Sequence, residues 1–221
     1  MPVQGLIFDM DGTMIDSMPY HAQSWIAFAR SHKLEIDVAE LLRQTTGRTG
    51  AECMEVLFNR PMDPQECWEL IHQKETIYRD LFAPVFAEVP GFKAFSALAH
   101  ARGLRIGVGT AGDKHNIAFA MGHLQMDPLP HAMVGGDEGL PGKPEPAIFL
   151  EAARRIGVDP QACIVFEDAP FGIEAARRAG MRAVAVCSSH SADQLAGDHV
   201  IAHITNYHDL IHNNFLETLH A

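Results

Sequence analysis

The stretch Leu6-Ile7-Phe8-Asp9-Met10-Asp11-Gly12-Thr13 carries the strongest structural signal in this 221-residue sequence. This stretch ends the run from Val3 to Phe8, which is apolar except for Gln4. Such a short, mainly apolar run predicts a β-strand that is buried on both faces. The run stops at an acidic segment with a glycine, which predicts a loop. Ligands of open parallel sheets bind beyond the carboxyl ends of the strands, so this loop is the first candidate for a functional site.

A repeated helix–strand pattern continues from about Phe92 through the second half of the chain. Alanine-rich helical stretches end in basic residues and a glycine, the residue that most easily adopts the left-handed backbone just past a helix end. Apolar strands follow, and we predict them over 104–110, 162–166 and 182–186. Helices that alternate with apolar strands predict an α/β fold with a doubly wound parallel sheet, covered by helices on both faces.

The segment from 15 to 86 has a different pattern, with helical periodicity and no apolar strand between the helices. Thr49 and Glu52 have the spacing of a capping box, in which two side chains satisfy the free backbone groups at a helix start. Such a segment, placed directly after the first strand, predicts an all-helical insertion. We therefore predict an α/β core of residues 1–14 and 87–221 and a helical cap of residues 15–86.

The composition limits the possible partners. The formal net charge is −11, with 17 basic and 28 acidic side chains, which argues against a nucleic-acid partner and against an anionic membrane surface. No apolar stretch has the length of a membrane span, and the start of the chain lacks the pattern of a secretory signal. Four widely spaced cysteines without a CxxC pair are typical of reduced thiols. We expect a cytoplasmic protein, and no feature indicates an obligate protein partner.

Polar side chains follow three of the predicted strands and lie in one further loop. The parallel arrangement brings them to one edge of the sheet, where clustered carboxylates repel each other by about 4 kcal/mol per pair at 4 Å and a dielectric constant near 20. A divalent cation relieves this repulsion, and oxygen ligands suit Mg²⁺. One aspartate could then approach a phosphate dianion, which predicts a phosphoryl-transfer site. The group consists of Asp9, Asp11, Thr110, Lys143, Glu167 and Asp168.

These residues resemble the four motifs of the haloacid dehalogenase (HAD)-like hydrolase superfamily. The resemblance rests on Asp9-Met10-Asp11-Gly12-Thr13, Thr110, Gly142-Lys143-Pro144 and Glu167-Asp168, whose order and spacing cover nearly the whole chain. It implies a Rossmann-like α/β core. The helical insertion after the first motif resembles the cap domain of the beta-phosphoglucomutase-like branch, which includes phosphatases.

The resemblance also implies chemical roles. Asp9 would attack phosphorus and form an aspartyl-phosphate, and Asp11 would protonate the leaving oxygen and then activate water. Thr110, Lys143 and the backbone amide of Ala111 would bind the phosphoryl oxygens. Branches that cleave carbon–halogen or carbon–phosphorus bonds usually lack the second acid, so Asp11 favours a phosphate ester as substrate.

The resemblance further implies a magnesium site. Asp9, Asp168 and the backbone carbonyl of Asp11 would bind Mg²⁺, and Glu167 would be a second carboxylate at the metal, directly or through water. The predicted activity is Mg²⁺-dependent hydrolysis of a small phosphorylated metabolite, most simply a sugar phosphate. A non-enzymatic, metal-bound regulatory module is the alternative of another class, but a regulator has no need for this whole set of groups.

The cap leaves phosphatase and phosphomutase as alternatives. His21 and Lys74 match positions of the beta-phosphoglucomutase-like pattern, and both are candidates for substrate contacts from the cap. The departure is at Gly47-Arg48-Thr49-Gly50, where Gly50 occupies the place expected for the mutase arginine that binds a second phosphate. Arg48 either substitutes for that arginine or is solvated. Lys74 either faces the cleft or packs with its stem along an apolar face.

A second candidate motif does not match its required context. Gly107, Gly109 and Gly112 have the GxGxxG spacing of dinucleotide-binding proteins, but the first two glycines lie inside a predicted strand and not in the turn after it. We therefore do not expect a dinucleotide cofactor.

Overall fold

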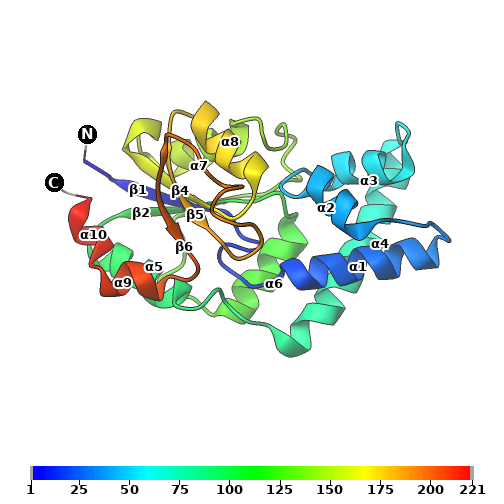
Figure 1. Ribbon diagram of the computed structural model, residues 1–221, viewed down its shortest axis with the longest axis horizontal. Coiled ribbons are helices and arrows are strands. Elements are labelled where there is room, and N and C mark those ends of the chain that lie inside the picture. The colour runs from blue at the N-terminus through cyan, green and yellow to red at the C-terminus, as the bar shows by residue number, and fades with distance from the viewer. Residues whose placement is uncertain (1, 220–221) are drawn as a thin grey trace.

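The computed structural model describes residues 2–219, and its core is one parallel sheet of six strands (Figure 1). The strand order is β3-β2-β1-β4-β5-β6, so the first strand lies in the middle and the chain winds outward from it in both directions. This arrangement confirms the predicted doubly wound α/β fold. The strands are β1 (Gly5–Phe8), β2 (Arg105–Gly109), β3 (Ala132–Val134), β4 (Cys163–Glu167), β5 (Arg182–Val186) and β6 (Val200–Ile204).

Four strands were predicted from the sequence within one or two residues, and the two edge strands were missed. β3 has only three residues, and β6 alternates half-buried and exposed side chains, including a histidine. Edge strands lie against a single neighbour, so neither of them needs the continuous apolar run on which the prediction depended.

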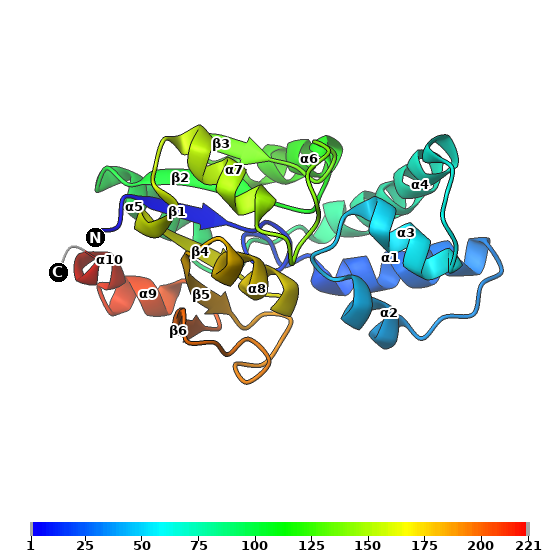
Figure 2. The same cartoon turned by 90° about the horizontal axis from the view of Figure 1, so that it is seen from above.

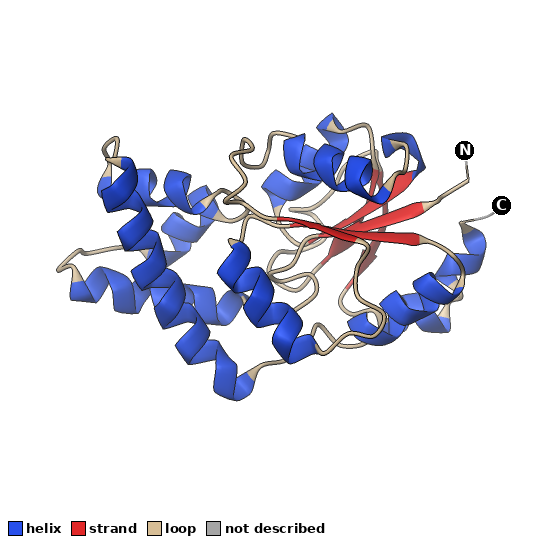
Figure 3. Cartoon of the chain, turned by 180° about the vertical axis from the view of Figure 1, so that it is seen from behind, coloured by secondary structure: helices blue, strands red, loops and turns tan. Residues whose placement is uncertain are grey.

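Helices cover both faces of the sheet, which Figure 3 shows nearly edge-on. Leu6 and Phe8 of β1 pack on one face, and Ile7 packs on the other, because successive side chains of a strand point to opposite sides. The second face is covered by α7 (Ala147–Ile156) and α8 (Pro170–Arg178), with the short η2 (Pro160–Ala162) beside them. The first face is covered by α5 (Phe92–Ala101), α6 (Lys114–Leu124), α9 (His208–His212) and α10 (Phe215–Thr218).

The segment after β1 forms a separate group of helices beyond the carboxyl end of the sheet (Figure 2). Within the described residues 17–87 there is no β-strand, and an apolar cluster centred on Trp25, Phe28 and Met54 joins the helices. Thr49 forms the predicted capping box with Glu52. The helices are α1 (Met18–Ser31), α2 (Val38–Thr45), α3 (Gly50–Phe58), α4 (Pro64–Phe82) and η1 (Ala83–Val85).

The cap and the core are joined by packing as well as by the chain. Tyr78 and Phe82, at the end of α4, belong to the same apolar cluster as Phe8 of the central strand. That residues 15–86 act as a cap and residues 1–14 and 87–221 as a core stays a prediction, and Met1, His220 and Ala221 lie outside the described residues. Among the helices of residues 2–219, none combines the length and apolar character that a membrane span requires.

Candidate active site

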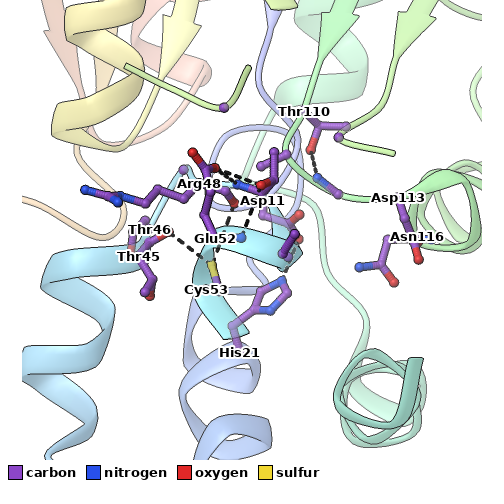
Figure 4. A pocket seen from close by; sticks show the side chains of 18 of the residues that line it. Asp11, His21, Thr45, Thr46, Arg48, Glu52, Cys53, Thr110, Asp113 and Asn116 are labelled. Carbon is purple, nitrogen blue, oxygen red and sulfur yellow. Dashed lines mark hydrogen bonds and ion pairs between the residues drawn. The ribbon is translucent and has the colours of Figure 1, made fainter. Parts of the chain in front are cut away.

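The carboxyl ends of three neighbouring strands open into one large cavity. β1 pairs with β2 on one side and with β4 on the other, so the residues that follow these strands become neighbours in space. The cavity, shown in Figure 4, has a volume of about 620 Å³. It lies between the sheet and the cap. Its lining includes the predicted residues Asp9, Asp11, His21, Arg48, Lys74, Thr110, Ala111, Glu167 and Asp168.

A buried carboxylate cluster forms the floor of the cavity. Asp9, Glu167 and Asp168 each place an oxygen within 4.8 Å of the others, although every one of them is nearly inaccessible to water. The Lys143 ammonium lies 2.6 Å from both Asp9 Oδ1 and Glu167 Oε1. Glu167 also accepts the backbone N–H of Ala169 at 2.7 Å. Three acids thus share one base, so the group would carry about two uncompensated negative charges if all three acids were ionised, in a place that water cannot screen.

This excess charge perturbs the acids. Burial raises the pKa of Asp9 to about 8 despite the nearby Lys143, and the charge of Glu167 adds to the rise. Burial also raises the pKa of Asp168 well above its ordinary value, with repulsion from Glu167 and Asp9 added. Burial alone would lower the pKa of Lys143, but the two adjacent carboxylates raise it. A hard dication bound by carboxylate oxygens would neutralise the remaining charge, so the donor set fits Mg²⁺.

Gly12 allows the first loop to approach this cluster. Its φ is +75°, and a Cβ at this position would lie 2.2 Å from Asp168 Oδ2. A larger residue would therefore push the loop away from Asp168, in addition to the strain of the left-handed conformation. The neighbouring Thr13 hydroxyl lies 3.4 Å from Asp168 Oδ1 and links the same two loops.

The Asp11 side chain points to the cap and not to the cluster. Its Oδ1 is 2.7 Å from the Ser17 hydroxyl, 3.1 Å from His21 Nε2 and 3.1 Å from the Tyr78 hydroxyl. Burial alone would raise the pKa of Asp11, but the electrostatic attraction of the His21 ring, whose Nε2–H faces this carboxylate, and the hydrogen bonds from these three residues outweigh it and lower the pKa to about 2. The predicted role of the Asp11 backbone carbonyl at the metal stays a prediction.

His21 connects Asp11 to Lys74. The Lys74 ammonium lies 2.8 Å from His21 Nδ1 and 2.9 Å from Glu75 Oε1, and it lies 4.8 Å from the centre of the Trp25 ring. An ammonium group can only donate, so Nδ1 of His21 accepts and its Nε2–H donates to Asp11. Lys74 is almost wholly buried and is among the residues that line the cavity. Of the two predicted alternatives, a lysine facing the cleft or one packed along an apolar face, the structure therefore has the first.

The predicted phosphate-binding residues lie beside the cluster. Thr110 is buried just after β2, and its hydroxyl oxygen accepts the N–H of Gly112 at 3.0 Å, which fixes the turn that carries Ala111. Because the hydroxyl oxygen is already an acceptor there, its proton can be donated to a ligand oxygen. Lys143 reaches the same corner from the loop before α7.

The far wall of the cavity is mostly acidic. Glu52 and Arg48 project from the cap, and Asp113 and Asn116 face them from the start of α6 (Figure 4). Asp113 caps α6 by accepting the backbone N–H groups of residues 115 and 116, and Glu75 accepts a hydrogen bond from Asn116 at 2.7 Å. The Arg48 guanidinium lies 5.0 Å from the centre of the Phe171 ring, and its Nε is buried without a hydrogen-bond partner in the described residues.

Several residues of this site could not be predicted from the sequence. Tyr78 lies within a helix and belongs to no motif, and helical periodicity does not show where a hydroxyl group points. Ser17 and Ser189 contact Asp11 and Asp168 from segments that carry no motif. Only the distance in space, and no sequence spacing, associates them with the acids.

Comparison with known proteins gives consistent matches along the chain. The haloacid dehalogenase-like hydrolase family matches residues 3–180. A fructose-1-phosphate phosphatase of Escherichia coli (strain K12), YqaB, is 34% identical over 185 residues, which are 82% of this chain and 95% of that protein. The beta-phosphoglucomutase of Bacillus subtilis (strain 168) is 30% identical over 191 residues, 83% of each chain. A crystal structure of a hydrolase from Pseudomonas syringae superposes with a TM-score of 0.86 at 22% identity, covering 99% of this chain and 100% of that one.

Proposed function

The chain belongs to the haloacid dehalogenase-like hydrolase family, and from this premise we propose that it is a Mg²⁺-dependent phosphatase of a small sugar phosphate. The observation that carries the proposal is the buried group of Asp9, Glu167 and Asp168 around one lysine, next to a cavity large enough for a phosphorylated hexose. Phosphatases occur among relatives of similar length, including one named for fructose 1-phosphate. Free thiols at all four cysteines support a cytoplasmic location.

Two aspartates carry out different parts of the reaction: Asp9 is the nucleophile, and Asp11 transfers protons. Bound Mg²⁺, held by Asp9, Asp168 and Glu167, would neutralise charge on the floor and on the phosphoryl group. Asp9 attacks phosphorus in line with the ester oxygen, and the bond to that oxygen breaks. Lys143, 2.6 Å from Asp9, draws the phosphoryl oxygens close to a carboxylate that would otherwise repel them.

Asp11 transfers the protons. In the first step it gives a proton to the leaving oxygen, and in the second it removes a proton from the water that attacks the aspartyl-phosphate. Its three contacts with Ser17, His21 and Tyr78 favour the charged form, which is the form needed for the second step. Substrate in the cavity would take over part of these contacts and raise the proton affinity of Asp11 for the first step.

The charge of the far wall supports transfer to water over transfer to a second hydroxyl. A mutase must bind the second phosphate of a bisphosphate, but Glu52, Glu75 and Asp113 are among the residues that line the cavity. Lys74 is already paired with Glu75. These carboxylates can accept hydrogen bonds from sugar hydroxyls, and they repel a second phosphate. The wall therefore favours hydrolysis of a monophosphate.

A beta-phosphoglucomutase-like activity is the second candidate. The observation that favours it is Arg48, whose Nε lacks a partner in the described residues and which lines the cavity. The relatives include a beta-phosphoglucomutase of similar length. The regulatory alternative has no comparable support, since the family is one of hydrolases.

The deciding experiment supplies hexose 1-phosphates and hexose 6-phosphates with Mg²⁺ and measures free phosphate and isomerised sugar phosphate together. We expect phosphate to be the main product and the reaction to stop in EDTA. Isomerisation with little phosphate released would establish the mutase instead. Asp113→Asn keeps the cap of α6 and removes one negative charge, so it should improve kcat/KM for a hexose bisphosphate about tenfold while leaving the monophosphate within about threefold.

A further inference from the structure

The loop after β5 contacts both of the strand ends that carry the candidate metal ligands. Ser188 donates a hydrogen bond to the backbone carbonyl of Gly12, in the loop after β1. The next residue, Ser189, donates to Asp168 Oδ2, in the loop after β4. Two adjacent residues thus tie the loop of Asp9 to the loop of Asp168.

The neighbouring donors and acceptors determine which way the Ser189 hydroxyl donates. His190 Nδ1 lies 2.9 Å from the backbone carbonyl of Asp168, which can only accept, so Nδ1 carries a proton. The same Nδ1 lies 2.8 Å from Ser189 Oγ, which therefore accepts from it. The hydroxyl proton of Ser189 has two acceptors within reach on Asp168, the backbone carbonyl oxygen at 3.1 Å and the closer carboxylate oxygen Oδ2. The carboxylate is charged and therefore attracts the proton more strongly. The His190 Nδ1–H is shared between the Asp168 carbonyl oxygen and Ser189 Oγ, and this contact orients the Ser189 hydroxyl.

We propose that Ser189, oriented by His190, is a positioning residue that holds the Asp168 carboxylate in the geometry for binding Mg²⁺. The inference rests on the metal site of the proposed function. The Asp168 carboxylate lies close to two like-charged groups, Asp9 and Glu167, and the backbone of Gly12 packs closely against it. Without the Ser189 hydrogen bond, rotation away from these neighbours would relieve the repulsion and move the oxygen out of the metal site. Hydrogen bonds to metal-binding carboxylates typically change metal affinity by 10- to 100-fold.

The contact between Ser189 and Asp168 is not needed to hold the loop in its conformation. The loop is stabilised by hydrogen bonds of its own, because the Ser191 backbone N–H and hydroxyl both donate to Gln194 Oε1, at 3.0 and 3.1 Å. Ser189 is exposed at the surface, so the loss of its hydroxyl removes little buried area. Its contribution to folding should therefore be small compared with its effect on Asp168.

The test compares Ser189→Ala with Ser189→Thr, which retains a hydroxyl, and with Ser191→Ala as the matched control in the same loop. Binding of Mn²⁺ is measured by electron paramagnetic resonance without substrate, and the Mg²⁺ activation constant is measured with a chromogenic phosphate ester. Urea unfolding in EDTA reports any structural damage.

We expect Ser189→Ala to weaken binding of both ions by about 10- to 100-fold. Its rate at saturating Mg²⁺ and its urea midpoint in EDTA should remain close to those of the wild type. Ser189→Thr should restore most of the affinity, and Ser191→Ala should leave it unchanged. Wild-type affinity in Ser189→Ala, or equal weakening in Ser191→Ala, would overturn the inference alone. A wild-type protein that binds neither ion would overturn the metal site of the proposed function and the inference with it.

Discussion

Asp9 and Asp11 are two residues apart, yet their conversion to asparagine should change stability in opposite directions. The pKa of Asp9 is raised from 3.8 to about 8, so between these pH values the folded state binds more protons than the unfolded state. Stability therefore falls as the pH rises through this window, by about 4 kcal/mol at pH 7. An asparagine carries no charge but still has a polar group to bury, so Asp9→Asn should stabilise the metal-free protein by about 2 to 4 kcal/mol at pH 7.

Asp11 has the reverse sign because its pKa is lowered from 3.8 to about 2. Its ionisation contributes stability that is fully present above pH 4 and is lost as the pH falls towards 2, about 2 kcal/mol in all. Since asparagine can keep part of the hydrogen bonding, Asp11→Asn should destabilise the protein by about 1 to 2 kcal/mol. This loss should be the same at every pH from 5 to 8, whereas the gain in Asp9→Asn should grow with pH.

The assay is urea unfolding in EDTA at pH 5, 6, 7 and 8. Added Mg²⁺ should stabilise the wild type more than Asp9→Asn, since the variant has lost one ligand and much of the repulsion. A variant Asp9→Asn that is less stable than the wild type at pH 7 in EDTA, or a gain that does not depend on pH, would refute the electrostatic account of the cluster.

Three further substitutions test other parts of the site. Tyr78→Phe removes one of the donors to Asp11 and should raise the pKa of that carboxyl by about one unit, which NMR titration of selectively labelled protein would detect; an unchanged pKa would contradict the hydrogen bond. Gly12→Ala should reduce kcat at least 100-fold, because the new Cβ would lie 2.2 Å from an oxygen of Asp168; wild-type kinetics would show that the loop can move freely. Lys74→Ala should raise KM for the natural sugar phosphate by about tenfold and KM for a small chromogenic ester by much less, because a cap residue binds the leaving group; equal effects on both esters would place Lys74 at the phosphoryl group.

The floor of the site could be predicted from the sequence because its geometry follows from parallel strands. Once 5–8, 105–109 and 163–167 are neighbouring parallel strands, the residues after each one must meet. No side-chain detail is needed for that conclusion. The raised pKa of Asp9 follows from its burial at this edge of the sheet, with repulsion from Glu167 added.

The upper half of the site could not be predicted in the same way. Whether His21 and Tyr78 reach Asp11 depends on how α1 and α4 pack over the sheet, and helical periodicity gives only the face and not the placement. Ser189 depends on the path of an irregular loop, for which the sequence has no periodic signal. Sequence spacing thus predicted the residues at strand ends, but it did not predict the contacts that Tyr78 and Ser189 make with the acids.

The most direct test of the central claim is chemical trapping of the phosphorylated aspartate. The wild-type protein is mixed with a sugar phosphate and Mg²⁺, quenched within milliseconds and reduced with borohydride, which converts an acyl-phosphate to the alcohol of homoserine. We expect homoserine at position 9 alone, only when Mg²⁺ is present, and at a level that decays as free phosphate appears. Phosphate release at the normal rate with intact Asp9, or homoserine at position 11, would contradict it.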